Sequence, residues 1–151
     1  MPKSKASLLL YSATSPIRYA IYIDGVKKEE FVCEKKCSVA LYEIFKPLLQ
    51  SYDIETIYYA RGPGSFMALK VTYIFLKTLS ISMNVKLKAT DSFFFSKNRA
   101  IRATKNSSFL KKEDRITITK ESIDEAIELP STLECDEFDD NLEPFYFLPA
   151  I

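Results

Sequence analysis

The sequence predicts an α/β fold built on a mixed sheet with flanking helices, and three features of the chain predict it. Short apolar runs typical of strands alternate with longer periodic segments typical of helices. The pair Asp24-Gly25 joins two of the strand-like runs, and this dipeptide favours the turn of an antiparallel hairpin. Later strand-like runs are separated by helical segments, as parallel neighbours require. Residues 7–95 are therefore expected to follow the order β-β-β-α-β-α-β-α.

The first third of the chain is expected to hold the hairpin and one helix. The predicted helix is Ser38–Ser51, with Ser38 as its N-cap, and Pro47 is expected to kink or shorten it. One apolar stripe supports this helix, formed by residues at helical spacing: Leu41, Ile44, Phe45, Leu48 and Leu49. The strands expected before it are Ser7–Tyr11, Arg18–Asp24 and Lys28–Val32.

The middle of the chain predicts a strand, a long helix, a strand and a short helix. The strands are Glu55–Ala60 and Val85–Ala89, and a short helix opens at Thr90-Asp91-Ser92. The long helix, Phe66–Met83, is apolar almost all round, so we expect it to be buried on two sides. Such a helix either lies centrally in its own domain or packs against another chain. Ser65 is the expected N-cap of this helix.

The remaining residues differ in charge and form the expected second unit. The segment Lys97–Lys120 carries eight basic and two acidic residues, and it predicts short strands at Ala100–Ala103 and Arg115–Thr119 with a turn at Glu113-Asp114. Glu121–Ile151 carries ten acidic residues and no basic one. The two segments either pair with each other or, as we favour, the acidic one is a solvated face. The predicted domains are thus residues 1–95 and 96–151.

The composition excludes several kinds of enzyme. The chain has no histidine, which removes the commonest general base and metal ligand. It has only three glycines, too few for a typical nucleotide cradle. The chain has an odd number of cysteines (Cys33, Cys37 and Cys135), and its start does not resemble a secretory leader. We therefore expect reduced thiols in the cytoplasm. We identify no apolar run approaching 18 residues, so no membrane-spanning segment is expected. No catalytic or metal-binding residue is predicted, and the tail carboxylates Glu137, Asp139 and Asp140 favour a solvated acidic loop over a divalent-ion site.

The most informative motif is the turn Arg61-Gly62-Pro63-Gly64-Ser65-Phe66. Glycines between a strand and a helix N-terminus indicate either a generic anion site or merely a tight loop that needs positive φ twice. The spacing does not fit a phosphate-binding P-loop, because Lys70 lies well inside the helix. Ser65 is not expected to be a nucleophile, since the G-x-S-x-G pattern and an activating histidine are both missing. Aromatic residues around the turn, among them Tyr73 and Phe75, favour an interface on at least one helix face.

The same motif carries a family resemblance. Residues 61–66, followed by Leu69 and basic Lys70, resemble the G-R-G-P-G-S-F-T-G-[LI]-R signature of the TsaB (YeaZ) family. Met67, Ala68 and Lys70 depart from it, where the family has Thr, Gly and Arg. Residues 7–95 fit the family well and the rest weakly, although the closing segment Glu143–Phe147 is similar to the family's terminal P-x-Y-L-R.

The resemblance implies an actin-like ATPase (ASKHA, ribonuclease H-like) fold with a complete first lobe and a truncated second lobe. It also implies a non-catalytic subunit of the complex that makes N6-threonylcarbamoyladenosine at position 37 of tRNA, partnered by a TsaD-type catalytic subunit and a TsaE-type ATPase. ATP and metal would then be bound by those partners and not by this chain alone. Tyr11 stands where actin-like ATPases keep an aspartate, which argues further against ATP hydrolysis by this chain.

The family implies that the flanking helices make the contact between subunits. The expected partner-binding residues are Leu41, Phe45, Arg61, Gly62, Pro63, Gly64, Ser65, Phe66, Lys70, Tyr73, Phe75 and Leu79. Two other functions stay open: a small nucleotide- or anion-binding enzyme that uses the Gly62–Ser65 turn, and a homodimeric structural protein without a tRNA role.

Overall fold

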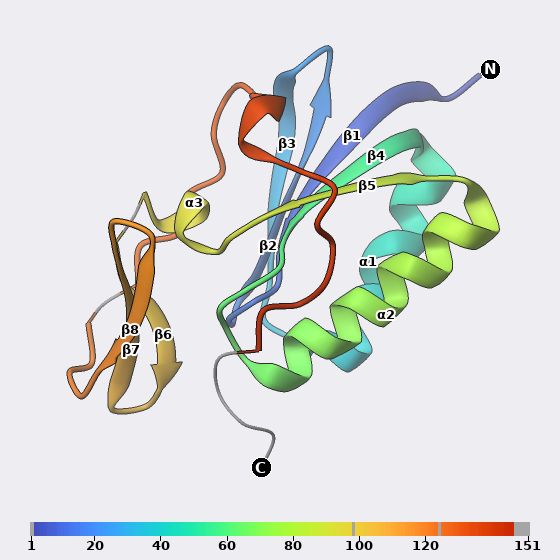
Figure 1. Ribbon diagram of the computed structural model, residues 1–151. Coiled ribbons are helices and arrows are strands. Elements are labelled where there is room, and N and C mark those ends of the chain that lie inside the picture. Colours follow the sequence, from blue (N-terminus) through green and yellow to red (C-terminus); the bar gives the residue numbers. More distant parts are fainter. Residues whose placement is uncertain (1, 98, 124, 147–151) are drawn as a thin grey trace.

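The computed structural model describes residues 2–97, 99–123 and 125–146, and these form two sheets and three α-helices. The larger sheet has the strand order β3-β2-β1-β4-β5 (Figure 1). Strand β2 pairs antiparallel with both β1 and β3, whereas β1, β4 and β5 are parallel. The strands are β1 (Ser4–Tyr11), β2 (Ile17–Ile23), β3 (Val26–Cys33), β4 (Tyr52–Ala60) and β5 (Lys86–Thr90). The predicted hairpin-led mixed sheet is confirmed.

The hairpin turn between β2 and β3 has the geometry that its sequence predicts. Asp24 has φ +52° and Gly25 has φ +79°, so both central residues are left-handed. A side chain on Gly25 would meet nothing within 4 Å, which shows that the backbone angle alone favours glycine there.

Helices α1 (Cys37–Ser51) and α2 (Phe66–Met83) cover one face of the larger sheet (Figure 1). The prediction for α2 and its cap is confirmed, because the Ser65 hydroxyl accepts from the Ala68 N–H. The predicted cap of α1 is wrong: Lys36 occupies the N-cap position and makes no side-chain cap bond. Helix α1 also continues past Pro47, whose ring is exposed, so the backbone groups that it leaves unpaired can be hydrated.

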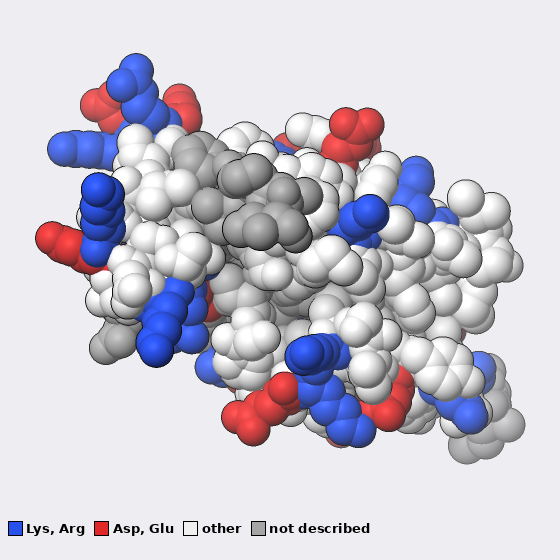
Figure 2. All heavy atoms as spheres, turned by 90° about the horizontal axis from the view of Figure 1, so that it is seen from below, with Lys and Arg blue, Asp and Glu red and all other residues white. Residues whose placement is uncertain are grey.

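The opposite face of the larger sheet is covered by α3 (Phe93–Ser96) and by a smaller antiparallel sheet of order β6-β7-β8. Its strands are β6 (Ile101–Thr104), β7 (Ser107–Lys112) and β8 (Arg115–Thr119). The sequence predicted β6, β8 and the turn between β7 and β8, but it missed β7. Figure 2 views the molecule from below, and Lys and Arg side chains project there from the end where the smaller sheet lies.

The residues after β8 return to the larger sheet. They pass through a short 3-10 turn (Cys135–Glu137), and Asp139 then exchanges two backbone hydrogen bonds with Ala89 of β5, at 2.9 and 3.0 Å. Further along, the Phe145 N–H donates to the Arg61 carbonyl at 2.7 Å. We call residues 138–146 the strap, because they close the β5 edge of the sheet. The acidic segment is mostly exposed, as favoured, but its contact with the first lobe was not predicted.

Candidate functional site

The turn between β4 and α2 is held by contacts within the chain. Gly62 has φ +122°, and a side chain there would lie 2.7 Å from the Phe145 carbonyl oxygen. A side chain on Gly64 would lie 2.7 Å from the Ala13 Cβ and closer still to its carbonyl oxygen. That oxygen accepts from the Ser65 N–H at 2.8 Å. Both glycines therefore permit close approach between parts of this chain, as in a tight loop. Of the two, only Gly62 has positive φ, so the expectation that the loop needs positive φ twice is wrong.

Arg61 binds the strap. Its guanidinium donates to the carboxylate of Asp139 at 2.9 and 3.4 Å, to the Ala89 carbonyl at 3.0 Å and to the Asn141 carbonyl at 3.2 Å. Its side chain is only 19% exposed. Because the planar guanidinium presents several donors at once, it can satisfy these acceptors together. The expected partner contact at Arg61 is therefore corrected: the side chain is occupied within the chain.

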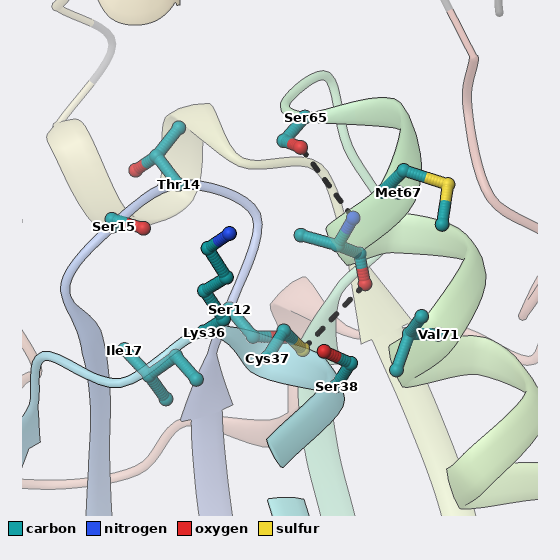
Figure 3. Close-up of a pocket in the computed structure, with 11 residues that line it drawn as sticks. Ser12, Thr14, Ser15, Ile17, Lys36, Cys37, Ser38, Ser65, Met67 and Val71 are labelled. Atoms are coloured by element: carbon teal, nitrogen blue, oxygen red, sulfur yellow. Dashed lines mark hydrogen bonds between the residues drawn. The ribbon is translucent and has the colours of Figure 1, made fainter. Parts of the chain in front are cut away.

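A cavity of about 350 Å³ opens beside this turn, where three segments meet (Figure 3). The loop after β1 contributes Ser12, Thr14 and Ser15, the start of α1 contributes Lys36–Ser38, and the start of α2 contributes Ser65–Ala68. Neither helix has an acidic residue in its first turn. The N-termini of two long helices, with their partial positive charge, thus converge on a cavity lined by hydroxyl groups and one lysine.

The polar groups at the floor of this cavity bond to one another. The hydroxyls of Ser12 and Thr72 are 2.7 Å apart, and the Cys37 sulfur lies 3.1 Å from the same Thr72 hydroxyl. Burial raises the pKa of the Cys37 thiol, although the hydrogen bond from Thr72 opposes this shift. The protonated thiol is a poor nucleophile. The floor of the cavity therefore offers no activated group for covalent chemistry.

Tyr11 ends β1 beneath this region and is fully buried. Its ring packs on Phe95 with centroids 4.9 Å apart. Its hydroxyl accepts from the Thr14 hydroxyl and donates to the carboxylate of Glu125. Glu125 also accepts hydrogen bonds from the Thr14 hydroxyl and the Arg102 N–H. Burial, with Glu125 adding to it, raises the pKa of the Tyr11 phenol well above its usual value. The phenol is therefore neutral near pH 7 and carries no charge with which to hold a metal ion.

The outer faces of α1 and α2 expose large apolar side chains. Buried residues of α2 are few: Leu69, Thr72 and Leu76. The expectation that α2 is buried on two sides within its own domain is wrong, because several apolar residues of both helices are more than half exposed: Val39, Tyr42, Met67, Ile74, Ile81 and Met83. An apolar groove of about 380 Å³ runs along α2 between Val71 and Ser82. We call these exposed residues and the groove the apolar helix face.

The predicted contact residues divide into three groups. Leu41 and Phe45 are each 1% exposed and belong to the core, so the expectation that they touch a partner is corrected. Gly62, Pro63 and Gly64 are also buried. Phe66, Tyr73, Phe75 and Leu79 are half-buried, while Ser65 and Lys70 are exposed. Phe75 and Leu79 line the apolar groove.

Sequence reasoning missed the residues that the apolar helix face exposes most. Val39, Tyr42, Ile74 and Ile81 were not identified as contact residues, although they lie outside the helices' buried stripes. The sequence does indicate them indirectly: apolar residues lie almost all round α2, and one sheet face cannot cover all of them.

Helix α2 is also long and apolar enough to cross a bilayer, although it contains Lys70 and Lys77. Its mean hydropathy over 18 residues is 1.3, and 17% of these residues are buried in the chain. Lys70 and Lys77 interrupt its apolar residues, so this finding does not contradict the expectation from sequence. Length and composition do not distinguish a membrane span from a helix packed on a sheet, and α2 packs through Leu69 and Leu76 on the sheet core.

No family model matches this chain, and no characterised protein matches its sequence. Two solved structures have a similar fold. One is YeaZ from Pseudomonas aeruginosa, at TM-score 0.58 and 16% identity over 82% of this chain and 67% of that chain. The other is an uncharacterized Pseudomonas aeruginosa protein with similarity to peptidase YeaZ, at TM-score 0.58 and 15% identity. This match covers 76% of the present chain and 63% of the other. The chain therefore has a YeaZ-like α/β fold of the actin-like ATPase class.

Proposed function

We propose that this chain is a non-catalytic scaffold subunit in the synthesis of N6-threonylcarbamoyladenosine in tRNA. Its partner in this proposal is a TsaD-type catalytic subunit, with a TsaE-type ATPase completing the assembly in the cytoplasm. The single observation that carries the proposal is the apolar helix face on a YeaZ-like fold. The R-G-P-G-S-F turn at the start of α2 gives independent support from the sequence.

The physical case for a protein partner is the exposed apolar surface. Ile81 is 82% exposed, Tyr42 64%, Met67 62% and Ile74 55%, all on two adjacent helices. Leaving so many large apolar side chains in water is unfavourable, and interfaces typically cover side chains of this kind. A protein partner would bury this surface.

Substitutions that leave the core intact provide the sharpest test. The sequence pointed to Phe75→Asp or Leu79→Asp, but the Phe75 ring packs on Phe45 with centroids 5.2 Å apart, so that change would also damage the core. Val39→Asp with Ile74→Asp places charge only on exposed sites. A matched control is Val32→Asp with Ile118→Asp, since these side chains are 51% and 42% exposed on strands β3 and β8.

The test is co-purification of each variant with the TsaD-type subunit of the same cell. The wild-type chain and the strand control are expected to co-purify in equal yield, and the helix variant is expected to lose the partner. Size-exclusion chromatography of the isolated chain tests a homodimer through the same face. Full recovery of the TsaD-type subunit by the helix variant would contradict the proposal.

A second candidate function is the binding of an anion in the cavity at the helix N-termini. The specific observation that favours it is that α1 has no side-chain cap and neither helix has an acidic first turn, while Lys36 lines the opening. Backbone N–H groups at helix starts favour negative charge. Calorimetry with magnesium ATP and with inorganic phosphate tests this candidate. Binding on the order of micromolar that is lost in Lys36→Glu would favour it over a purely scaffolding chain.

A further inference from the structure

The smaller sheet concentrates the positive charge of a chain that is almost neutral overall. The formal net charge is +1, yet residues 97–120 alone carry eight basic and two acidic residues. The compensating carboxylates lie in the segment after β8, which holds ten acidic residues. Whether the sheet is neutralised therefore depends on where the fold places those carboxylates.

The fold directs several of those carboxylates away from the cations of the smaller sheet, although Glu125 accepts a hydrogen bond from the Arg102 backbone N–H at 2.8 Å. Asp139 pairs with Arg61 at 2.9 Å and Asp140 pairs with Lys88 at 2.7 Å, both on the larger sheet. Glu128 pairs with Lys97 at 2.7 Å, before the first strand of the smaller sheet. Five basic residues of the smaller sheet form no ion pair with any residue in the described parts of the chain: Arg102, Lys105, Lys112, Arg115 and Lys120.

Strand register places three of these cations on one face. Arg102 pairs with Ser108, and Lys112 pairs with Arg115. Because side chains alternate along a strand, Ser108 and Lys112 of β7 point to the same side, opposite to Phe109. Phe109 is fully buried against the larger sheet, so Arg102, Lys112 and Arg115 point to the opposite side. These three side chains are exposed, whereas Ser108 between them is buried and its hydroxyl accepts from the Ile123 N–H at 3.0 Å. We call this face the basic face and include in it Lys105 and Lys120, which lie at the end of the sheet where β6 turns into β7.

Two positive charges lie close together at the turn between β7 and β8, and their repulsion is unfavourable. Lys112 and Arg115 are directly opposite in the β7–β8 pair, and both side chains are exposed. Like charges directly opposite destabilise an antiparallel pair. Glu113 and Asp114 lie in the turn between them, but neither forms an ion pair with them. An anion bound between the two cations would relieve their repulsion.

We propose that the basic face binds the phosphate backbone of RNA. Spaced cations on an exposed sheet fit a row of phosphates, each of which is neutralised with release of counterions. The sole aromatic residue between positions 99 and 120 is Phe109, which is buried, so the face has no ring on which a base could stack. The contact is therefore to the backbone and independent of sequence, and base recognition belongs to another part of the assembly. The choice of RNA rests on the function proposed above.

The test is fluorescence anisotropy with a labelled anticodon stem-loop RNA and the full chain, over salt from about 50 to 200 mM. The variant is Arg102→Ala with Lys112→Ala and Arg115→Ala. The matched control is Lys5→Ala with Lys28→Ala and Lys86→Ala, which removes the same charge from exposed sites on the larger sheet. The basic-face variant is expected to bind at least about tenfold more weakly, and its slope of log affinity against log salt is expected to be shallower by roughly two to three. The control is expected to match wild type.

Three results would overturn the inference: no binding of RNA by the wild type, equal losses in the two triple variants, or binding of anionic lipid vesicles in place of RNA. Lys105→Ala with Lys120→Ala provides a second, smaller change at the other end of the face if the triple variant unfolds at lower urea. Co-purification with the TsaD-type subunit is measured on the same proteins. Normal co-purification without RNA binding would refute this inference alone, whereas loss of co-purification by the wild type would refute the proposed function.

Discussion

Gly64→Ala is expected to destabilise the fold because it separates α2 from the loop after β1. The new methyl group would lie 2.7 Å from the Ala13 Cβ, whereas carbon atoms pack at about 3.5–4.0 Å. The two segments must move apart by roughly 1 Å, which breaks the 2.8 Å hydrogen bond from the Ser65 N–H to the Ala13 carbonyl. Overpacking costs about 1–3 kcal/mol. The lost hydrogen bond adds about 1 kcal/mol.

The free energy of unfolding should therefore fall by about 2–4 kcal/mol, or about 5–15 °C in Tm for a chain of this length. Urea unfolding followed by circular dichroism measures it. Gly25→Ala is the control, because its methyl group would enter open space and only the left-handed φ of +79° is strained, at about 1–2 kcal/mol. A loss in Gly64→Ala no greater than in Gly25→Ala would refute this account of the turn.

Two further predictions concern the strap and alkaline stability. Arg61→Ala should lower the free energy of unfolding by about 1–3 kcal/mol, with the ion pair itself contributing little since Asp139 is 57% exposed, and should speed proteolytic cleavage near Asp139. The free energy of unfolding of Arg61→Lys should lie between those of the wild type and Arg61→Ala. Unchanged cleavage in Arg61→Ala would contradict the view that Arg61 holds the strap in place. Burial of the phenol, and to a lesser extent its hydrogen bond to Cys135, raises the pKa of Tyr58 from the usual 10.0 to about 12. The stability that the neutral Tyr58 phenol contributes is complete below pH 10 and is lost as the pH rises toward about 12. Tyr58→Phe should therefore flatten the fall in the free energy of unfolding over that range. An unchanged pH profile would argue against this role of Tyr58.

Hydrophobic periodicity predicted much of the fold because most elements pack on the larger sheet through one regular stripe. The bounds of α2 and β8 were predicted as observed, and the hairpin turn was specified locally by Asp24-Gly25. Strand β7 was missed because SSFLKK has no clear alternation. Its strand conformation is completed by pairing with β6 and β8, and local sequence does not report such partners.

The candidate site was predicted less completely than the fold. The turn motif was found, but the sequence could not show that Arg61 reaches Asp139, 78 residues further along the chain. Periodicity also showed that α2 has more apolar residues than one stripe needs, without showing which face the sheet covers. The sequence therefore predicts contacts at Leu41 and Phe45, which are core residues, and does not identify the exposed Ile74 and Ile81.

We propose that the apolar helix face docks the catalytic subunit that modifies tRNA. It is tested most directly by the threonylcarbamoyladenosine content of tRNA, measured by mass spectrometry of digested nucleosides, in cells depleted of this chain and supplied with each variant. The wild type and the strand control, Val32→Asp with Ile118→Asp, should restore the modified nucleoside, and Val39→Asp with Ile74→Asp should not. Full restoration by the helix variant, or no loss of the nucleoside on depletion, would contradict the account.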